Sequence, residues 1–308
     1  MSPASPDRSR TQAADRSELQ AWLDASRAWF ERELAVHFAP AQGGVPGSLG
    51  DAMLYAVSGG GKRVRPMLVR LACHWCGGDD AACVRPAVAV ELIHAYSLVH
   101  DDLPCMDDDD WRRGRPSCHK QFGEALALLA ADALQSKAFE VLAGGGDRRT
   151  PQWVGVLARA IGGAGMVGGQ VLDMTLTDEA PQAIEIERMH ALKTGALITA
   201  AAELGAIAAD AKARERELVR AYAAAIGACF QATDDILDVT SDRASLGKTP
   251  GKDARLHKAT LVAALGLEGA RERARAHAQA ARVAAVELGG GSTPLALALV
   301  DEMLDRRS

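Results

Sequence analysis

Two long stretches of this chain carry no charged side chain, and each of them ends in a pair of aspartates. Residues Leu92–His100 contain no Asp, Glu, Lys or Arg, and Asp101 begins the pair that follows at once. Residues Ala221–Thr233 have the same character, and Asp234 begins the second pair. A helix that is apolar on every face is buried. The sequence therefore predicts two core helices that each deliver carboxylates to the end of their buried part.

The rest of the chain has helical rather than strand periodicity. Hydrophobic residues make up 48% of the 308 residues and aromatic residues only 4%, and alanine, which favours helices, is abundant. Glycine and proline punctuate the periodic segments near residues 41–48, 58–62, 76–80, 143–151 and 288–294. We expect an all-α protein with a disordered N-terminal tail over residues 1–15 and one domain over residues 16–308.

Composition excludes several classes of protein. The net charge of -5 gives no support to nucleic-acid binding, which needs a basic field. The first residues lack the apolar segment of a secretory signal, and no run reaches the roughly 18 apolar residues of a membrane span. The six cysteines match neither a zinc-site spacing nor a secreted disulfide framework, although Cys73 and Cys76 form a CxxC. We expect buried, reduced thiols in a cytoplasmic protein without a membrane span.

The aspartate clusters are typical of a site for hard divalent cations. Burying a carboxylate is unfavourable unless it is paired, and carboxylates at a helix C-terminus also face the negative end of the helix dipole. Pro104 indicates that the first helix ends there. Mg²⁺ takes one or two carboxylates and leaves its other positions to water and substrate phosphates. Asp234 and Asp238 lie four residues apart and share a helix face.

Basic residues gather near both clusters. Lys62 and Arg65 follow a run of glycines in "GGGKRVRP", and glycines let backbone N–H groups approach an anion. His94 shares a helix face with Asp101. Lys193, in "HALKTGALI", lies inside an apolar segment and needs a partner. Metal ions can bridge carboxylates to one phosphate while bare cations bind another, so two diphosphate-bearing substrates are the natural inference.

The chain resembles the trans-isoprenyl diphosphate synthases, and among them the bacterial farnesyl diphosphate synthases. The motifs that carry the resemblance span about residues 50–260, in the order of the family: "GGGKRVRP", "ELIHAYSLVHDDLPCMDDDDWRRGRPSCHKQFGEALALLAADAL", "GMVGGQVLD", "HALKTGALI" and "CFQATDDILDVTSDRASLGKTPGKD". The resemblance implies the isoprenoid synthase fold, a barrel of long helices around a deep central cavity, in a homodimeric prenyltransferase. It also implies Mg²⁺-dependent head-to-tail condensation of isopentenyl diphosphate with dimethylallyl or geranyl diphosphate.

The resemblance assigns roles residue by residue. Three Mg²⁺ ions, for which Mn²⁺ can substitute, are held by Asp101, Asp107 and Asp234, with support from Asp102, Asp235 and Asp238. Isopentenyl diphosphate is bound by Lys62, Arg65, His94 and Arg113. The allylic diphosphate is bound by Arg112, Lys193, Thr194, Gln231 and Lys248. Gln170 and Asp173 lie in the cavity wall, whereas Asp108, Asp109 and Asp110 are assigned only to a loop.

The resemblance also bears on product length. Ser97 lies four residues before Asp101 on the same helix face and is small, whereas Tyr96 lies to the side and can form a floor about 6–7.5 Å down the helix. A bulky aromatic residue here implies the C15 product, farnesyl diphosphate, with C20 or C10 products as alternatives. Two departures from the family are Trp111, in place of a smaller aliphatic residue, and a basic tail reduced to Arg306 and Arg307.

Three other functions compete with this interpretation. A terpene cyclase shares the fold but handles one diphosphate, so it does not need the pocket of Lys62 and Arg65. A metal phosphohydrolase based on His100 and Asp101 would need further histidine ligands, and "DDILD" offers none. A non-catalytic regulatory subunit would have lost one aspartate cluster or the basic pocket, and the sequence retains both.

Overall fold

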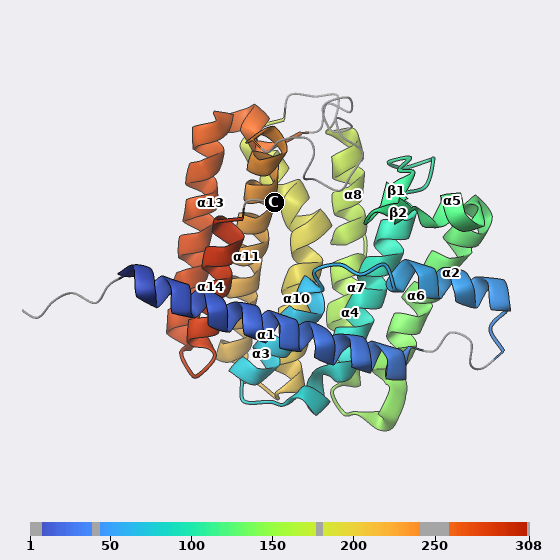
Figure 1. Cartoon of the computed structure of the whole chain (residues 1–308), viewed down its shortest axis with the longest axis horizontal. Coiled ribbons are helices and arrows are strands. Elements are labelled where there is room, and N and C mark those ends of the chain that lie inside the picture. Colours follow the sequence, from blue (N-terminus) through green and yellow to red (C-terminus); the bar gives the residue numbers. More distant parts are fainter. Residues whose placement is uncertain (1–7, 39–43, 177–180, 241–258, 307–308) are drawn as a thin grey trace, which may run out of the picture.

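The computed structural model of the chain describes residues 8–38, 44–176, 181–240 and 259–306, and the side chains from residue 16 onward. Its helices, labelled as in Figure 1, are α1 (Arg8–His37), α2 (Gly47–Val57), α3 (Val64–Trp75), α4 (Asp80–Asp101), α5 (Cys118–Phe122), α6 (Glu124–Ala143), η1 (Gly144–Gly146), α7 (Thr150–Ile161), α8 (Met166–Thr175), α9 (Ala183–His190), η2 (Ala191–Gly195), α10 (Ala196–Ala208), α11 (Ala213–Thr240), α13 (Leu261–Leu288) and α14 (Thr293–Leu304). The all-α prediction is confirmed.

Long helices run side by side through the body of the molecule, and α1 crosses in front of their lower half (Figure 1). Helix α10 lies at the centre, where it packs against α3, α4, α7 and α11. Eleven of its residues are buried. Gly205 permits the contact with α3, because a Cβ there would lie 2.1 Å from the carbonyl oxygen of Val69. The centre of the bundle is therefore packed backbone against backbone.

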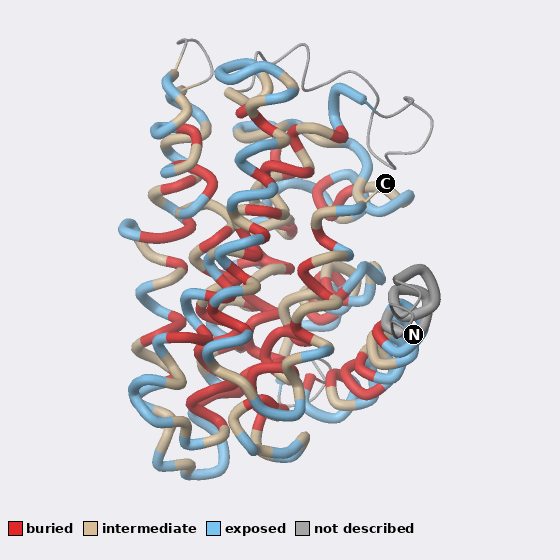
Figure 2. The backbone as a smooth tube through the Cα atoms, turned by 90° about the vertical axis from the view of Figure 1, so that its left-hand side faces the viewer, coloured by how far each residue is buried: buried red, intermediate tan, exposed pale blue. Residues whose placement is uncertain are grey.

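The two uncharged stretches form parts of α4 and α11, as predicted. Buried residues follow the helices on their inner sides in Figure 2. Helix α4 ends at Asp101, and the turn that contains Pro104 follows it. The stretch in α11 is less completely buried than expected, because Ala221 and Ala224 are exposed. A small alanine side chain exposes little apolar area, so absence of charge alone overestimates burial.

Two local features differ from the expectations. Helix α1 begins at Arg8, inside the stretch predicted as a disordered tail, because its alanine-containing sequence sustains helix. A short hairpin, β1 (Trp111–Arg112) and β2 (Arg115–Pro116), was not predicted. Strands of two residues are too short to show alternation, and the hairpin depends on its turn. The two turn residues, Arg113 and Gly114, both have positive φ, at 54° and 76°.

All six cysteines are free thiols. Four of them are buried, as predicted, whereas Cys76 is half-buried and Cys105 is exposed. Cys105 lies in the turn after α4, where the side chains point into solvent. The cysteines therefore contribute packing rather than covalent cross-links.

Three helical stretches are long and apolar enough to cross a membrane: 80–101, 150–175 and 183–208. In the first and third, 72% and 67% of the apolar window is buried inside the structure, where the neighbouring helices account for the hydrophobicity. In the second, only 33% is buried. The absence of a membrane span stays a prediction.

Candidate active site

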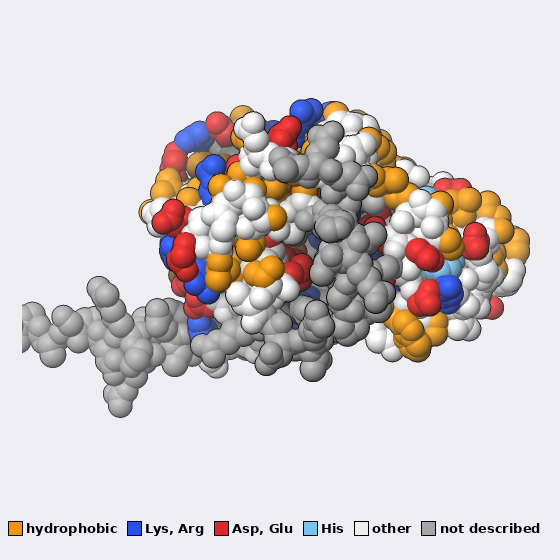
Figure 3. All heavy atoms as spheres, turned by 90° about the horizontal axis from the view of Figure 1, so that it is seen from above, with side chains coloured by type: hydrophobic (Ala, Val, Ile, Leu, Met, Phe, Trp, Pro, Cys, Tyr) orange, Lys and Arg blue, Asp and Glu red, His pale blue; other side chains and the backbone are white. Residues whose placement is uncertain are grey.

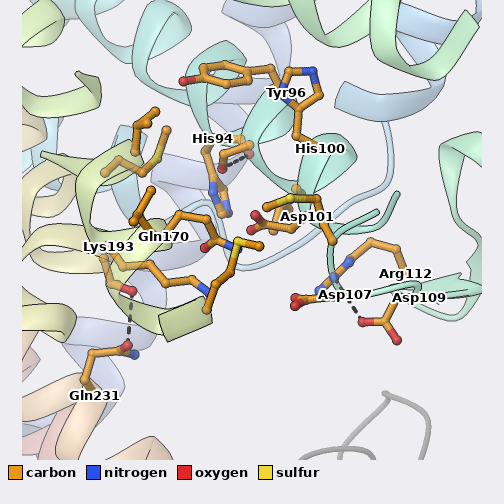
Figure 4. Close-up of a pocket in the computed structure, with 18 of the residues that line it drawn as sticks. His94, Tyr96, His100, Asp101, Asp107, Asp109, Arg112, Gln170, Lys193 and Gln231 are labelled. Carbon is orange, nitrogen blue, oxygen red and sulfur yellow. Dashed lines mark hydrogen bonds and ion pairs between the residues drawn. The ribbon is translucent and has the colours of Figure 1, made fainter. Parts of the chain in front are cut away.

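A cavity of about 640 Å³ lies between α4, α8, η2 and α11. Figure 4 shows Asp101 and Asp107 on one side of it and Lys193, Gln170 and Gln231 on the other. Seen from above in Figure 3, acidic and basic side chains face a hollow at this end of the bundle. The predicted site residues that line the cavity are Arg65, His94, Tyr96, Ser97, Asp101, Asp107, Arg112, Gln170, Lys193, Thr194 and Gln231. Residues far apart in the sequence therefore line one cavity, whereas Asp234 and Arg113 are not among its lining residues.

Asp101 is the last residue of α4 and faces the cavity. Burial raises the pKa of its carboxyl to about 6, and the negative charges of Asp107 and Asp102 act in the same direction, against Lys193 and Arg112. The backbone N–H of Asp107 donates to the carbonyl oxygen of Asp101 over 2.8 Å, which folds the intervening turn back. The turn thus places two carboxylates at the mouth of one cavity.

Asp102 has a different partner from its neighbour. Its buried carboxylate accepts hydrogen bonds from Nε of Arg112, at 3.0 Å to Oδ1 and 3.2 Å to Oδ2, and from Nη2. The Arg112 guanidinium also lies 3.6 Å from Asp109 and lines the cavity. Burial raises the pKa of Asp102 despite this cation. Asp102 therefore fixes the orientation of Arg112.

Arg113 reaches toward the glycine loop after α2. Its Nη1 donates to the carbonyl oxygen of Gly60. A Cβ at Gly61 would lie 2.8 Å from the guanidinium carbon of Arg113, so a side chain at this position would displace the arginine. The glycines that the sequence assigned to anion binding also make room for a cation.

Arg65 and His94 lie near Arg113 in a cluster of positive charge. Burial lowers the pKa of Arg65 to about 10, and Arg113 lowers it further against the opposing charge of Glu91. Burial and these same arginines hold the pKa of His94 well below its ordinary value. His94 is therefore neutral, and its ring can donate one hydrogen bond without adding charge.

Lys193 and Thr194 lie on η2, a five-residue stretch of π-helix between α9 and α10. Such wide turns occur frequently at functional sites because they turn side chains out of helical register. Lys193 Nζ lies 2.5 Å from Asp173 Oδ2, which supplies the partner that the sequence required. Thr194 Oγ1 donates to Gln231 Oε1 over 3.0 Å and joins η2 to α11. The π-helix thus presents two polar side chains to the cavity.

Gly169 determines how close η2 lies to α8. A Cβ on Gly169 would lie 2.1 Å from the backbone nitrogen of Lys193, which is far inside van der Waals contact. The glycine pair in "GMVGGQVLD" is therefore a packing requirement, and the sequence alone did not reveal it. Asp173, one turn further along α8, reaches Lys193 from this position.

The second aspartate cluster is divided among three surroundings. Asp234 Oδ1 accepts a hydrogen bond from Nη1 of Arg306 over 2.7 Å. Asp235 is buried, and its Oδ2 accepts from the backbone N–H of Leu261 over 2.7 Å, at the start of α13. Asp238 is exposed on the same helix. The contact with Leu261 gives Asp235 a structural role in capping α13.

Several predicted residues lie outside the cavity lining. Lys62 lines a neighbouring cavity together with Arg306. Lys248 and Arg307 lie outside the described residues. Trp111 is 53% exposed on β1, so its large side chain disturbs no core packing beside Arg112.

Apolar side chains of α8 form a cavity wall that the sequence did not reveal. Val167, Val171 and Met174 line the cavity although each is at least 50% exposed. Their spacing of four and three residues places them on one face of the helix. The remaining apolar residues of the lining are Leu98, Met106, Met166 and Phe230. The sequence does show apolar residues repeated on one face of this helix. The same pattern occurs in a helix that packs against the core, so it does not identify a cavity wall.

The run after Asp107 is divided between cavity and surface. Asp109 lines the cavity, whereas the carboxylates of Asp108 and Asp110 lie within 4.8 Å of each other and of a His119 ring nitrogen. Lys120 Nζ lies 2.9 Å from Asp110 Oδ1. Asp108 and Asp110 thus belong to the surface beside the hairpin.

The chain is similar in sequence to known prenyl diphosphate synthases. The sequence profile of the polyprenyl synthetase family matches residues 47–286. The chain is 47% identical to farnesyl diphosphate synthase of Escherichia coli, over 83% of this chain and 88% of that protein. It is 46% identical to geranylgeranyl pyrophosphate synthase 11 of Arabidopsis thaliana, over 83% of this chain and 73% of that protein.

Solved structures show the same fold. An FPP/GFPP synthase from Zymomonas mobilis, 35% identical, superposes with a TM-score of 0.81 over 93% of this chain and 99% of its own. A geranylgeranyl pyrophosphate synthase, 25% identical, superposes with a TM-score of 0.85 over the same shares.

Gly169→Ala should destabilise the protein by about 1–3 kcal/mol, because the new methyl group overlaps the Lys193 backbone and must displace η2. Chemical denaturation measures the change. Gly163→Ala is the matched control, since a Cβ there meets no atom within 4 Å. Equal stability of the two variants would contradict the close packing of α8 on η2.

Asp101→Asn should stabilise the protein in the presence of a chelator as pH rises. The folded protein keeps the Asp101 proton up to about pH 6, whereas the unfolded chain loses it near 3.9, so this group's contribution to stability falls between these values. The amide cannot ionise. The advantage of the variant should grow from near zero below about pH 4 to at most about 3 kcal/mol above pH 6. Urea unfolding of both proteins across this range measures it, and a constant difference would refute the raised pKa.

Proposed function

This chain belongs to the polyprenyl synthetase family, and we propose that it condenses isopentenyl diphosphate head to tail with dimethylallyl and then geranyl diphosphate, releasing diphosphate and forming farnesyl diphosphate. One observation carries the proposal. A single cavity has apolar side chains on one wall and carboxylates and cations at its polar end, and a second polar group, Arg65 and His94 near Arg113, contributes to the same lining. This arrangement suits two diphosphates and one long hydrocarbon product.

The carboxylates suit Mg²⁺. Asp101 and Asp107 face one cavity, and burial, together with the like charges, raises the pKa of Asp101, which a hard divalent cation would reverse. We assign Asp101, Asp107 and Asp234 as the residues that would hold the ions. Bound there, Mg²⁺ would neutralise the charge that develops on the allylic diphosphate.

The allylic diphosphate is the leaving group. Arg112 and Lys193 face the cavity from opposite sides, and each is oriented by a carboxylate, Asp102 or Asp173. Cations that are already in place stabilise developing negative charge without reorganisation. Cleavage of the C–O bond therefore leaves the diphosphate on these residues and an allylic cation in the cavity.

Isopentenyl diphosphate would be held by the second cluster, formed by Arg65, His94 and Arg113. Positioning its double bond beside the allylic carbon removes much of the entropic barrier. The side chains of Met106, Met166 and the α8 wall supply the apolar part of the lining that would lie beside the cation. We assign the final proton to the released diphosphate.

Tyr96 is the residue that we assign to the cavity floor. It lines the cavity, is 5% exposed, and its ring lies edge-on to His100 with a centroid distance of 5.7 Å. Ser97 is the small neighbour, and its hydroxyl donates to the carbonyl oxygen of His94 over 3.0 Å. The resemblance to geranylgeranyl diphosphate synthases makes a C20 product the second candidate.

A homodimer through α2 and α6 would cover an apolar face. Leu128 and Leu129 of α6 are 44% and 55% exposed, and Leu54 of α2, which packs beside α6, is 47% exposed. Large exposed leucines that lie together are typical of an interface between protein chains.

We place the enzyme in the cytoplasm, because its cysteines form no disulfide.

Purified protein incubated with Mg²⁺ and isopentenyl diphosphate should extend dimethylallyl and geranyl diphosphate to farnesyl diphosphate. The length of the dephosphorylated products is measured by gas chromatography with each primer in turn. Omission of the primer is the control. A protein that consumes no isopentenyl diphosphate with any primer would refute the proposed function.

Tyr96→Ala should lengthen the product beyond C15, because it would remove the ring that we assign to the floor of the cavity. Product length is read in the same assay. Tyr96→Phe keeps the ring and should keep the C15 product. If Tyr96→Ala also stopped at C15, another residue would have to form the floor.

A further inference from the structure

The C-terminal end of the described chain is anchored on the second aspartate cluster. Arg306, two residues after α14 ends, donates from Nη1 to Asp234 Oδ1 over 2.7 Å. Its guanidinium lies 4.5 Å from the ring centroid of Phe230, one helical turn before Asp234 on α11. The arginine side chain is only 14% exposed. Both contacts come from α11, so α14 is joined there to a helix of the active site.

The guanidinium of Arg306 makes only some of the hydrogen bonds that it could donate. Its Nε is buried and has no hydrogen-bond partner among the described residues. It also lies near Lys62, because both line a second cavity of about 570 Å³, to which Phe230 also contributes. Burial lowers the pKa of Lys62, and Arg306 is the next cause, opposed by Asp234 and Glu302. Arg306 is therefore held mainly by the charge of Asp234.

We infer that Arg306 is an internal cation on Asp234, and that a metal ion must displace it to bind there. The inference rests on the proposed function, which assigns Asp234 to a metal. A divalent cation on Asp234 repels the guanidinium, so the two compete for the carboxylate. Binding of the metal is then coupled to release of the chain's end, and the coupling is reciprocal.

Diphosphate should help the metal ion to displace Arg306 from Asp234. Once Arg306 leaves Asp234, it and Lys62 still line one cavity, and the carboxylate of Glu302 in the same lining offsets only part of their positive charge. An anion bound there removes their repulsion. Diphosphate thus stabilises the released state, and Mg²⁺ alone has to work against the ion pair. The arginine accordingly keeps the site weak for metal until a diphosphate is present.

Arg306→Gln tests this coupling without turnover. Titration calorimetry should show Mg²⁺ binding to the variant roughly fivefold to tenfold tighter than to the wild-type protein, the order expected for loss of one partly buried competing cation. With inorganic diphosphate present, the two affinities should converge. Arg282→Gln is the matched control, because it removes an ion pair between α13 and Asp301 of α14 and leaves Asp234 untouched.

Equal Mg²⁺ affinity of the wild-type protein and Arg306→Gln, with and without diphosphate, would overturn the inference. Amide exchange gives a second measurement on the wild-type protein. Saturating Mg²⁺ should speed exchange near the end of α14, after Met303, and unchanged exchange would contradict release of the anchor. Failure of the proposed function is seen separately, as absence of condensation, since neither measurement requires a prenyl substrate.

Discussion

The energetics of this site depend on burying carboxylates at the ends of apolar helices. Desolvation disfavours the charged form of each carboxylate, and cationic side chains from other parts of the fold compensate for this cost. Asp102 receives Arg112 from the hairpin, and Asp173 receives Lys193 from η2. For Asp101 the cost of burial is not fully compensated, and the pKa of its carboxyl is raised to about 6. A buried carboxylate with a raised pKa beside other carboxylates has an electrostatic preference for added positive charge.

The cations reach these positions through irregular backbone rather than regular helix. Lys193 lies on a π-helix that packs against a glycine of α8. Arg113 has a positive φ in the hairpin turn, and its guanidinium occupies the space that a side chain at Gly61 would fill. Each irregularity is less favourable than ideal helix, and the surrounding packing has to enforce it. The rigid core around α10 is what makes this enforcement effective.

Much of the site could be predicted from sequence, because charge at the end of an uncharged helix is a local signal. The resemblance implied that Asp101, His94 and Lys193 belong to one site, and all three line the same cavity. It was harder to predict from the sequence in which direction each side chain points and which partner it meets. Asp102 and Asp235 resemble their neighbours in sequence, yet one orients Arg112 and the other caps α13. Adjacent residues on a helix point about 100° apart, so two neighbours in a pair face different surroundings, which the sequence does not show.

The sequence by itself determined the all-α class, the two buried helices and the identity of the family, since these depend on periodicity, propensity and motif order along the chain. The tertiary structure alone decided which carboxylate meets which cation. Arg306 lies 72 residues from Asp234, and Gly169 contacts a residue 24 positions away. No local pattern encodes such contacts, because they exist only where the packing of α8, η2, α11 and α14 brings the segments within reach.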